Sequence, residues 1–201
     1  MRRRVKPATD RKRQILEALA HQLEVNPGEH ITTAGLARAV GVSEAALYRH
    51  FPSKARMFEG LIEFSEQAVF GRVASILEQH TDPAVRCEMI MGVALGFSSR
   101  NPGITRILLG EALVGEPERL RRRSEQYFNR LETQLRQVLR EGRASGGVRR
   151  EIPSEVAANL LLALLAGRMR QFVHSGFELD PMKHWEQQWE LLVSALFISD
   201  R

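Results

Sequence analysis

Apolar residues recur along most of the chain at the three- and four-residue spacing of an amphipathic helix, and no convincing run alternates as a half-buried strand does. In the first such segment, residues 10–23, Ile15, Leu19 and Leu23 fall on one face. Asn26-Pro27-Gly28 follows as a turn signal. The pattern therefore predicts an all-helical protein that begins with a helix over residues 10–23.

Two short helices are predicted next from their capping residues. Thr32 precedes an apolar stretch that ends at Gly41, and Ser43 precedes a second stretch that ends before Pro52. A threonine or serine hydroxyl accepts a backbone N–H at the start of a helix, and glycine adopts the left-handed backbone that ends one. The residue before a proline avoids the helical region. Two short helices joined at a glycine form the pattern of a helix-turn-helix.

The rest of the chain divides into longer helices at proline, glycine and serine residues. The apolar run 156–167 is too short to span a bilayer and predicts a buried core helix, so no contact with a membrane is expected. Residues 142–150 are predicted to form a flexible loop. The predicted helices of this part cover residues 53–80, 84–99, 104–114, 117–141, 154–174 and 181–197.

The composition of the 201 residues is that of an ordinary folded protein. The apolar fraction of 43% and the charged fraction of 26% exclude low-complexity, collagen-like and wholly disordered chains. Cys87 is the single cysteine and cannot form an intrachain disulfide, which fits a reducing cytoplasm. The histidines show no metal-ligand spacing, and no catalytic or phosphate-binding motif is visible. We therefore expect no metal, no cofactor and no enzymatic activity.

The positive charge of the chain is concentrated at its N-terminus. Residues 1–13 hold seven basic side chains and one acidic one, whereas the other residues hold 22 basic and 23 acidic side chains. A basic arm of this kind suits a polyanion such as DNA or RNA, although a solvated tail is the alternative.

The predicted helix-turn-helix also has the side chains that DNA binding requires. Ala37 is small enough for its two helices to cross closely, and the short residues after Ser43 let the second helix approach the floor of the major groove. Basic and hydroxyl side chains follow that can donate to phosphates. The predicted DNA contacts are Thr32, Thr33, Ser43, Ala45, Tyr48, Arg49, His50 and Lys54.

The run from Ile31 to Lys54, with Val40-Gly41-Val42-Ser43 and Leu47-Tyr48-Arg49-His50-Phe51-Pro52-Ser53-Lys54, resembles the DNA-binding domain of the TetR family of regulators. The resemblance implies an all-α homodimer. Its three-helix DNA-binding domain would cover residues 1–52, and a six-helix regulatory and dimerisation domain would cover residues 53–201. It also implies a dimer interface on the last two helices. The apolar stripe of Met182, Trp185, Trp189, Leu192 and Leu196 then belongs either to that interface or to the core of one chain.

Further segments resemble the nucleoid occlusion factors within this family. They are residues 43–64, 96–108, 134–141 and 170–173. The resemblance implies a cytoplasmic, nucleoid-associated protein that binds palindromic double-stranded DNA and, on DNA, inhibits FtsZ polymerisation so that no septum forms over the chromosome. Its alternative is a ligand-responsive transcriptional repressor on the same fold.

The same resemblance implies a site for the acidic and apolar tail of FtsZ. From the residues alone, Phe64 would be a core residue and Arg72 part of a solvated face. Gly35 stands where the relatives carry a basic residue. The residues implied for binding the FtsZ tail are Phe64, Arg72, Gly96, Arg100 and Asn101.

Overall fold

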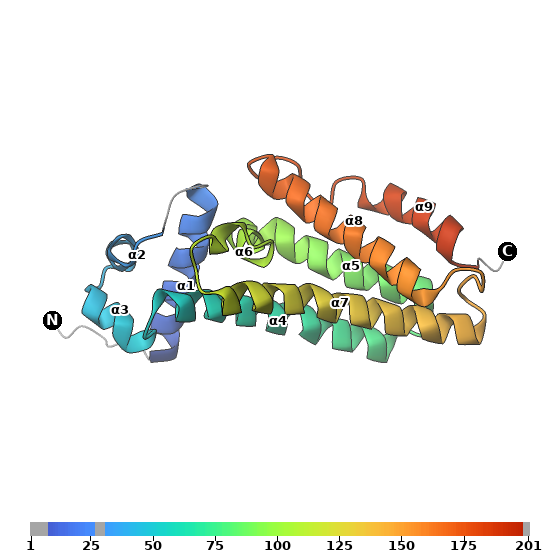
Figure 1. Ribbon diagram of the computed structural model, residues 1–201, viewed down its shortest axis with the longest axis horizontal. Coiled ribbons are helices and arrows are strands. Elements are labelled where there is room, and N and C mark those ends of the chain that lie inside the picture. The colour runs from blue at the N-terminus through green and yellow to red at the C-terminus, as the bar shows by residue number, and fades with distance from the viewer. Residues whose placement is uncertain (1–7, 27–30, 199–201) are drawn as a thin grey trace.

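A computed structural model describes residues 8–26 and 31–198, and each predicted helix has a counterpart in that part of the chain (Figure 1). The described residues contain no strand, and Val148 and Phe197 form an isolated antiparallel bridge. The predicted all-α fold is therefore confirmed. The helices are α1 (Ala8–Val25), α2 (Thr33–Val40), α3 (Glu44–His50), α4 (Lys54–Gln79), α5 (Pro83–Arg100), α6 (Pro102–Leu108), the 3₁₀ helix η1 (Glu111–Leu113), α7 (Glu118–Ser145), α8 (Ser154–His174) and α9 (Trp185–Leu196).

The helix-turn-helix, α2 and α3, is capped as its sequence predicts. The Thr32 hydroxyl accepts the amide of Gly35 at 3.1 Å, and the Ser43 hydroxyl accepts the amide of Ala46 at 3.2 Å. Gly41 ends α2 with a φ of 72°, a conformation that glycine adopts without a Cβ clash. Local residue preferences therefore set both ends of the turn between α2 and α3.

The first three helices join the rest of the molecule through a close contact between α1 and α6. A Cβ added to Gly103 would lie 2.0 Å from the carbonyl oxygen of Ala20, so the two backbones nearly touch. The buried Arg106 donates to the carbonyl oxygen of Leu23 at 2.7 Å. This carbonyl lies in the last turn of α1, where the helix itself provides no hydrogen-bond donor. This contact ties the position of α1 to that of α6.

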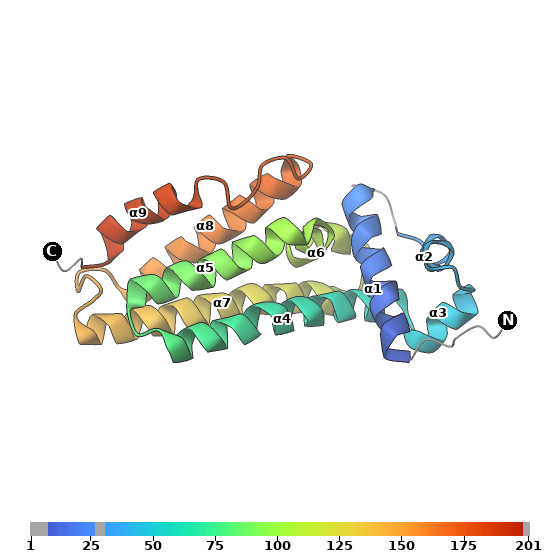
Figure 2. The same ribbon diagram turned by 180° about the vertical axis from the view of Figure 1, so that it is seen from behind.

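The remaining helices form an elongated body with α5 in its middle. Helices α4, α7, α8 and α9 pack around α5 (Figures 1 and 2). Cys87 on α5 is fully buried, and burial raises the pKa of its thiol to about 12. Trp185 and Trp189 on α9 are 5% and 4% exposed within this single chain. The α9 stripe therefore belongs mainly to the intrachain core, the plainer of the two interpretations that the sequence left open.

The boundary predicted between a helix and a flexible loop at Gly142 is wrong. The helix predicted to end at residue 141 continues to Ser145, and the left-handed residue that ends it is Gly146, with a φ of 91°. Gly142 is buried inside α7, where an added Cβ would lie 2.6 Å from Val148 and 2.7 Å from Pro83. This glycine serves close packing rather than helix termination.

Two other predicted helices are shorter than expected. The helix predicted over residues 104–114 is divided into α6 and η1 by Gly110, which has a φ of 82°. The last helix begins at Trp185 instead of residue 181, because His184 before it adopts a left-handed φ of 61°.

α8 is long and apolar enough by composition to cross a membrane, the one such helix among the described residues. It packs on α7 and α5, and Leu161, Leu165 and Met169 are buried there. The prediction of a core helix agrees with this packing.

Candidate DNA-binding and peptide-binding sites

The helix-turn-helix lies at one end of the molecule, where hydrogen bonds join its two helices (Figure 1). The Thr33 hydroxyl donates to a carboxylate oxygen of Glu44 at 2.8 Å, and the Tyr48 hydroxyl donates to Thr33 Oγ1 at 3.4 Å. Thr32 and Ser43 use their hydroxyl oxygens as cap acceptors. Their hydroxyl protons stay available for a phosphate oxygen.

The predicted DNA contacts on α3 are open to solvent, whereas Lys54 is not free. Ala45 and Arg49 are exposed and His50 is half-buried, and neither Arg49 nor His50 has a hydrogen bond or ion pair among the described residues. The ammonium of Lys54 lies 2.6 Å from a carboxylate oxygen of Glu116. A phosphate would have to compete with that carboxylate. Residues 1–7 of the basic arm lie outside the described residues, and its residues 8–13 belong to the start of α1.

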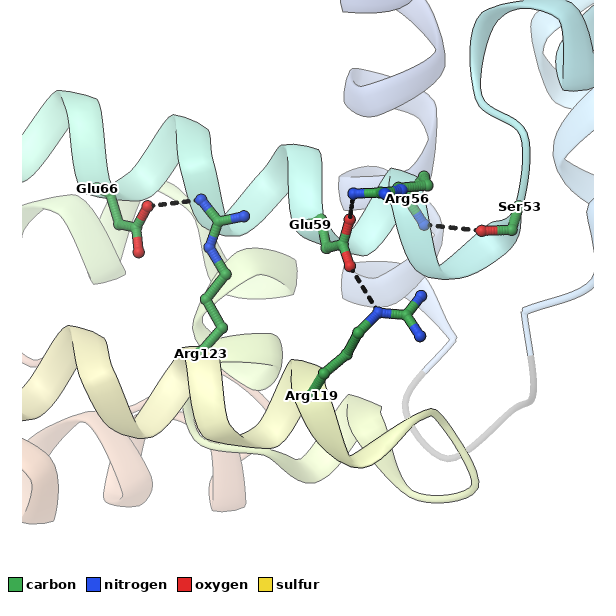
Figure 3. Close-up of polar contacts among 6 residues, drawn as sticks. All are labelled: Ser53, Arg56, Glu59, Glu66, Arg119 and Arg123. Atoms are coloured by element: carbon green, nitrogen blue, oxygen red, sulfur yellow. Dashed lines mark hydrogen bonds and ion pairs between the residues drawn. The ribbon is translucent and has the colours of Figure 1, made fainter.

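Ion pairs attach the first half of α4, which follows the helix-turn-helix, to α7. Glu59 accepts from Arg56 at 2.7 Å and from Arg119 at 2.9 Å (Figure 3). Two turns further along α4, Glu66 accepts from Arg123 at 2.8 Å. Burial alone would raise the pKa of Glu59, but the hydrogen bonds and charges of Arg119 and Arg56 hold it below its usual value. These pairs fix the start of α4 on the body.

The second site is a groove of about 830 Å³ between α4, α5 and the start of α9. These three helices lie on the face shown in Figure 2. Phe64 is 49% exposed, and its ring centre lies 6.1 Å from that of Phe97. The groove brings together four of the five residues predicted for the FtsZ tail, namely Phe64, Arg72, Arg100 and Asn101.

Gly96, the fifth predicted residue, lies beneath the side chain of Arg100. It is buried, and an added Cβ would lie 3.4 Å from a guanidinium nitrogen of Arg100. Asn101 donates its side-chain amide to the carbonyl oxygen of Phe97 at 2.8 Å. Gly96 and Asn101 thus shape the position of Arg100 and the end of α5.

The two arginines of the groove have no charged partner among the residues that the structure describes. Neither Arg72 nor Arg100 makes an ion pair or side-chain hydrogen bond with another described residue, and both are exposed. Unpaired guanidinium groups beside exposed apolar side chains suit a peptide that carries carboxylates and apolar residues. Glu88 lines another part of the groove, where burial and the nearby charge of Glu186 raise its pKa.

Several groove residues were not predicted from the sequence. Met89, which is 38% exposed, lines the groove, and so do Met182 and Trp185, whose stripe the sequence assigned to the core or to a dimer interface. On the same helix as Met89, Phe97 and Met91 are buried. Met182 and Trp185 lie far along the chain from the groove residues of α4 and α5, the last of which is Asn101, so no local spacing could place them there.

Comparison with known proteins places the chain among bacterial regulators. Residues 15–61 match the profile described as bacterial regulatory proteins, tetR family, and residues 81–197 match the SlmA-like profile described as tetracyclin repressor-like, C-terminal domain. The nucleoid occlusion factor SlmA of Marinomonas sp. is 50% identical over 190 residues, which is 94% of this chain and 96% of the relative. That of Shewanella pealeana is 51% identical over 193 residues, covering 96% and 98%.

Solved structures with the same fold are more distant in sequence. The ketosteroid transcriptional regulator KstR2 of Mycobacterium tuberculosis superposes with a TM-score of 0.77 at 18% identity and covers 98% of both chains. The fatty acid degradation regulator FadR from Bacillus halodurans gives a TM-score of 0.78 at 17% identity, covering 95% of this chain and 97% of that one. These similarities concern the fold alone.

Proposed function

Because the chain belongs to the TetR family and, within that family, to the nucleoid occlusion factors named SlmA, we propose that it inhibits FtsZ polymerisation when it is bound to DNA. The protein is a DNA-binding nucleoid occlusion factor. It would bind palindromic sites on the nucleoid, in the cytoplasm, and keep a septum from forming over the chromosome.

The observation that best supports the FtsZ part of this proposal is the groove between α4 and α5. It combines an exposed aromatic ring, Phe64, with two unpaired guanidinium groups, Arg72 and Arg100. A short acidic and apolar tail would bury its apolar residues on Phe64 and Met89 and place its carboxylates near the arginines.

The DNA part of the proposal relies on α2, α3 and the basic arm. Arg49 and His50 would hold phosphates together with Tyr48, while Ser43 and Ala45 bring the start of α3 to the major groove. The arm over residues 1–13 would add attraction that does not depend on sequence and that salt weakens.

A dimer through α8 and α9 fits the apolar side chains that one chain leaves exposed. Val156 and Leu160 lie one turn apart on α8 and are 59% and 50% exposed, and Leu191 on α9 is 72% exposed. Such a face on two long helices favours a four-helix interface with a second copy.

The proposal is tested by GTP-driven FtsZ polymerisation followed by sedimentation. The protein is added with and without a palindromic duplex selected from random DNA. We expect the sedimented polymer to fall with protein and duplex together, and much less with either alone. Unchanged polymer at saturating duplex would contradict the proposal.

Groove variants then connect the activity to the site. Phe64→Ala and Arg72→Asp should each weaken inhibition at least about tenfold while DNA affinity stays the same, because they remove the apolar contact and one positive charge. Arg140→Asp makes the same charge change on α7, outside the groove, and should behave like the wild type.

The ligand-responsive repressor, the alternative on the same fold, is not favoured by any specific observation. The middle of the body is occupied by side chains such as Tyr127, which is 1% exposed and whose ring centre lies 5.5 Å from that of Phe70.

A further inference from the structure

The groove has a third side, which we call the α9 wall and define as Met182 and Trp185. Both residues line the same groove as Phe64 and Arg100. Met182 is half-buried, so part of its side chain is open to a ligand, and Trp185 is 5% exposed. A peptide lying along α4 and α5 would therefore meet α9 as well.

Trp185 offers this groove an unused hydrogen-bond donor. Its indole N–H has no acceptor among the described residues, and its nitrogen is not among their fully buried, unsatisfied side-chain atoms. The nitrogen lies 3.7 Å from where a Cβ on Gly92, another groove residue, would stand. At that point α5 carries no side chain, so the indole nitrogen lies beside the groove where the groove is bounded by Gly92. A tryptophan N–H in a largely apolar site usually finds a partner.

Arg168 of α8 holds the α9 wall in place through hydrogen bonds to the residues around it. This buried side chain donates to the carbonyl oxygen of Pro181 at 2.7 Å, to that of Lys183 and to the side chain of Gln188. The loop before α9 also contains a left-handed residue, His184. The loop is thus fixed in one arrangement before any ligand arrives, which reduces the ordering cost of binding.

We propose that the α9 wall is part of the binding site for the acidic and apolar peptide, with Trp185 donating its indole N–H to a carbonyl or carboxylate oxygen of that peptide and Met182 contacting an apolar side chain. The inference rests on the proposed function, because the occupant is the FtsZ tail. The unpaired Arg72 of α4 and Arg100 of α5 line the same groove and favour the same kind of ligand, a peptide with carboxylates among apolar residues.

The sequence contains two tryptophans, which makes a direct test possible. A synthetic FtsZ tail peptide is titrated into two variants of the DNA-bound dimer. Trp189→Phe keeps Trp185 as its one tryptophan, and Trp185→Phe keeps Trp189. We expect the fluorescence emission to change in Trp189→Phe alone. We also expect the peptide Kd of Trp185→Phe, measured by anisotropy of a labelled peptide, to rise about three- to tenfold through loss of one hydrogen bond.

Trp189→Phe is a matched control, because its ring is buried to the same extent but does not line the groove. Met182→Glu is a second variant that disturbs the core less, and it should raise the peptide Kd at least about tenfold by repelling the peptide's carboxylates. DNA affinity should be unchanged in all three.

The outcomes separate the inference from the proposed function. If Phe64→Ala abolishes peptide binding while Trp185→Phe and Met182→Glu bind like the wild type, the inference is overturned and the proposed function stands. If the wild type itself does not bind the peptide on DNA, both are overturned.

Discussion

At the residue scale, Glu59 shows how one carboxylate can fix the start of a long helix. It is 13% exposed and accepts from arginines on two helices, Arg56 of α4 and Arg119 of α7 (Figure 3). An exposed ion pair contributes little, but a partly buried carboxylate with two guanidinium partners forms a small network whose geometry is set on both sides.

The lowered pKa of Glu59 predicts a pH-dependent contribution to stability. Its folded pKa lies below the usual 4.5, so the contribution is present above that value and is lost as the pH falls through the folded pKa. Glu59→Gln should lower the free energy of unfolding by about 1 kcal/mol at pH 7, and this difference should shrink as the pH falls below 4.5 and through the folded pKa of Glu59.

Urea denaturation at several pH values measures this difference. The control is Glu118→Gln, because Glu118 is 62% exposed and pairs with Arg122 within the same helix. The ion-pair network contributes nothing if Glu59→Gln lowers the free energy of unfolding by no more than Glu118→Gln does. The same conclusion follows if the decrease for Glu59→Gln persists unchanged in acid.

At the element scale, the local signals in the sequence located most helix ends. The caps at Thr32, Ser43 and Ser53 and the start at residue 154 are where the residue types predict them. One error occurred where tertiary packing decides the role of a glycine: Gly142 ends no helix, because it packs closely against Pro83 and Val148. That contact joins residues far apart in the chain, and local preference carries no information about it.

The groove shows the same limit for the site. Phe64, Arg72, Arg100 and Asn101 were placed by resemblance, and the structure brings them together. The α9 residues could not be placed from the sequence, because apolar spacing alone fits a core, an interface or a groove wall equally well.

Because α1 and α6 are in close contact, we expect replacement of Gly103 by alanine to destabilise the protein, unlike the same replacement at a glycine outside this contact. Gly103→Ala puts a methyl group 2.0 Å from the Ala20 carbonyl oxygen, a backbone atom that cannot rotate away. The substitution should lower the free energy of unfolding by about 1–3 kcal/mol and weaken DNA binding, since α1 packs against α2 and α3.

Gly71→Ala on α4 is the matched control, because nothing lies within 4 Å of the added Cβ. It should stabilise the protein by about 0.5–1 kcal/mol through higher helix propensity. Urea denaturation and DNA anisotropy measure both variants, and equal behaviour of the two would contradict a tight α1–α6 contact.

At the scale of the whole molecule, the exposed face of α8 and α9 predicts the dimer contact. Leu160→Glu places a charge in the middle of that face and should raise the dimer Kd at least about a hundredfold, since an unpaired charge is costly to bury. Affinity for a palindromic duplex should fall with it, because each half-site then binds separately.

Sedimentation velocity measures the association. Val114→Glu is the control, because Val114 is 73% exposed but lies after η1, outside both helices. A dimeric Leu160→Glu protein would place the interface elsewhere.

The burial of Cys87 has a practical consequence. A thiol with 0% exposure and a pKa of about 12 is neither accessible nor ionised at neutral pH. Maleimide and methanethiosulfonate reagents should therefore not modify Cys87 in the folded protein. Cys87 therefore does not have to be replaced before another site is labelled through cysteine. A single cysteine introduced on the surface of α3 or at the rim of the groove would carry a spin label without background. Distances across the dimer, with and without duplex, would then reveal whether DNA rearranges the groove.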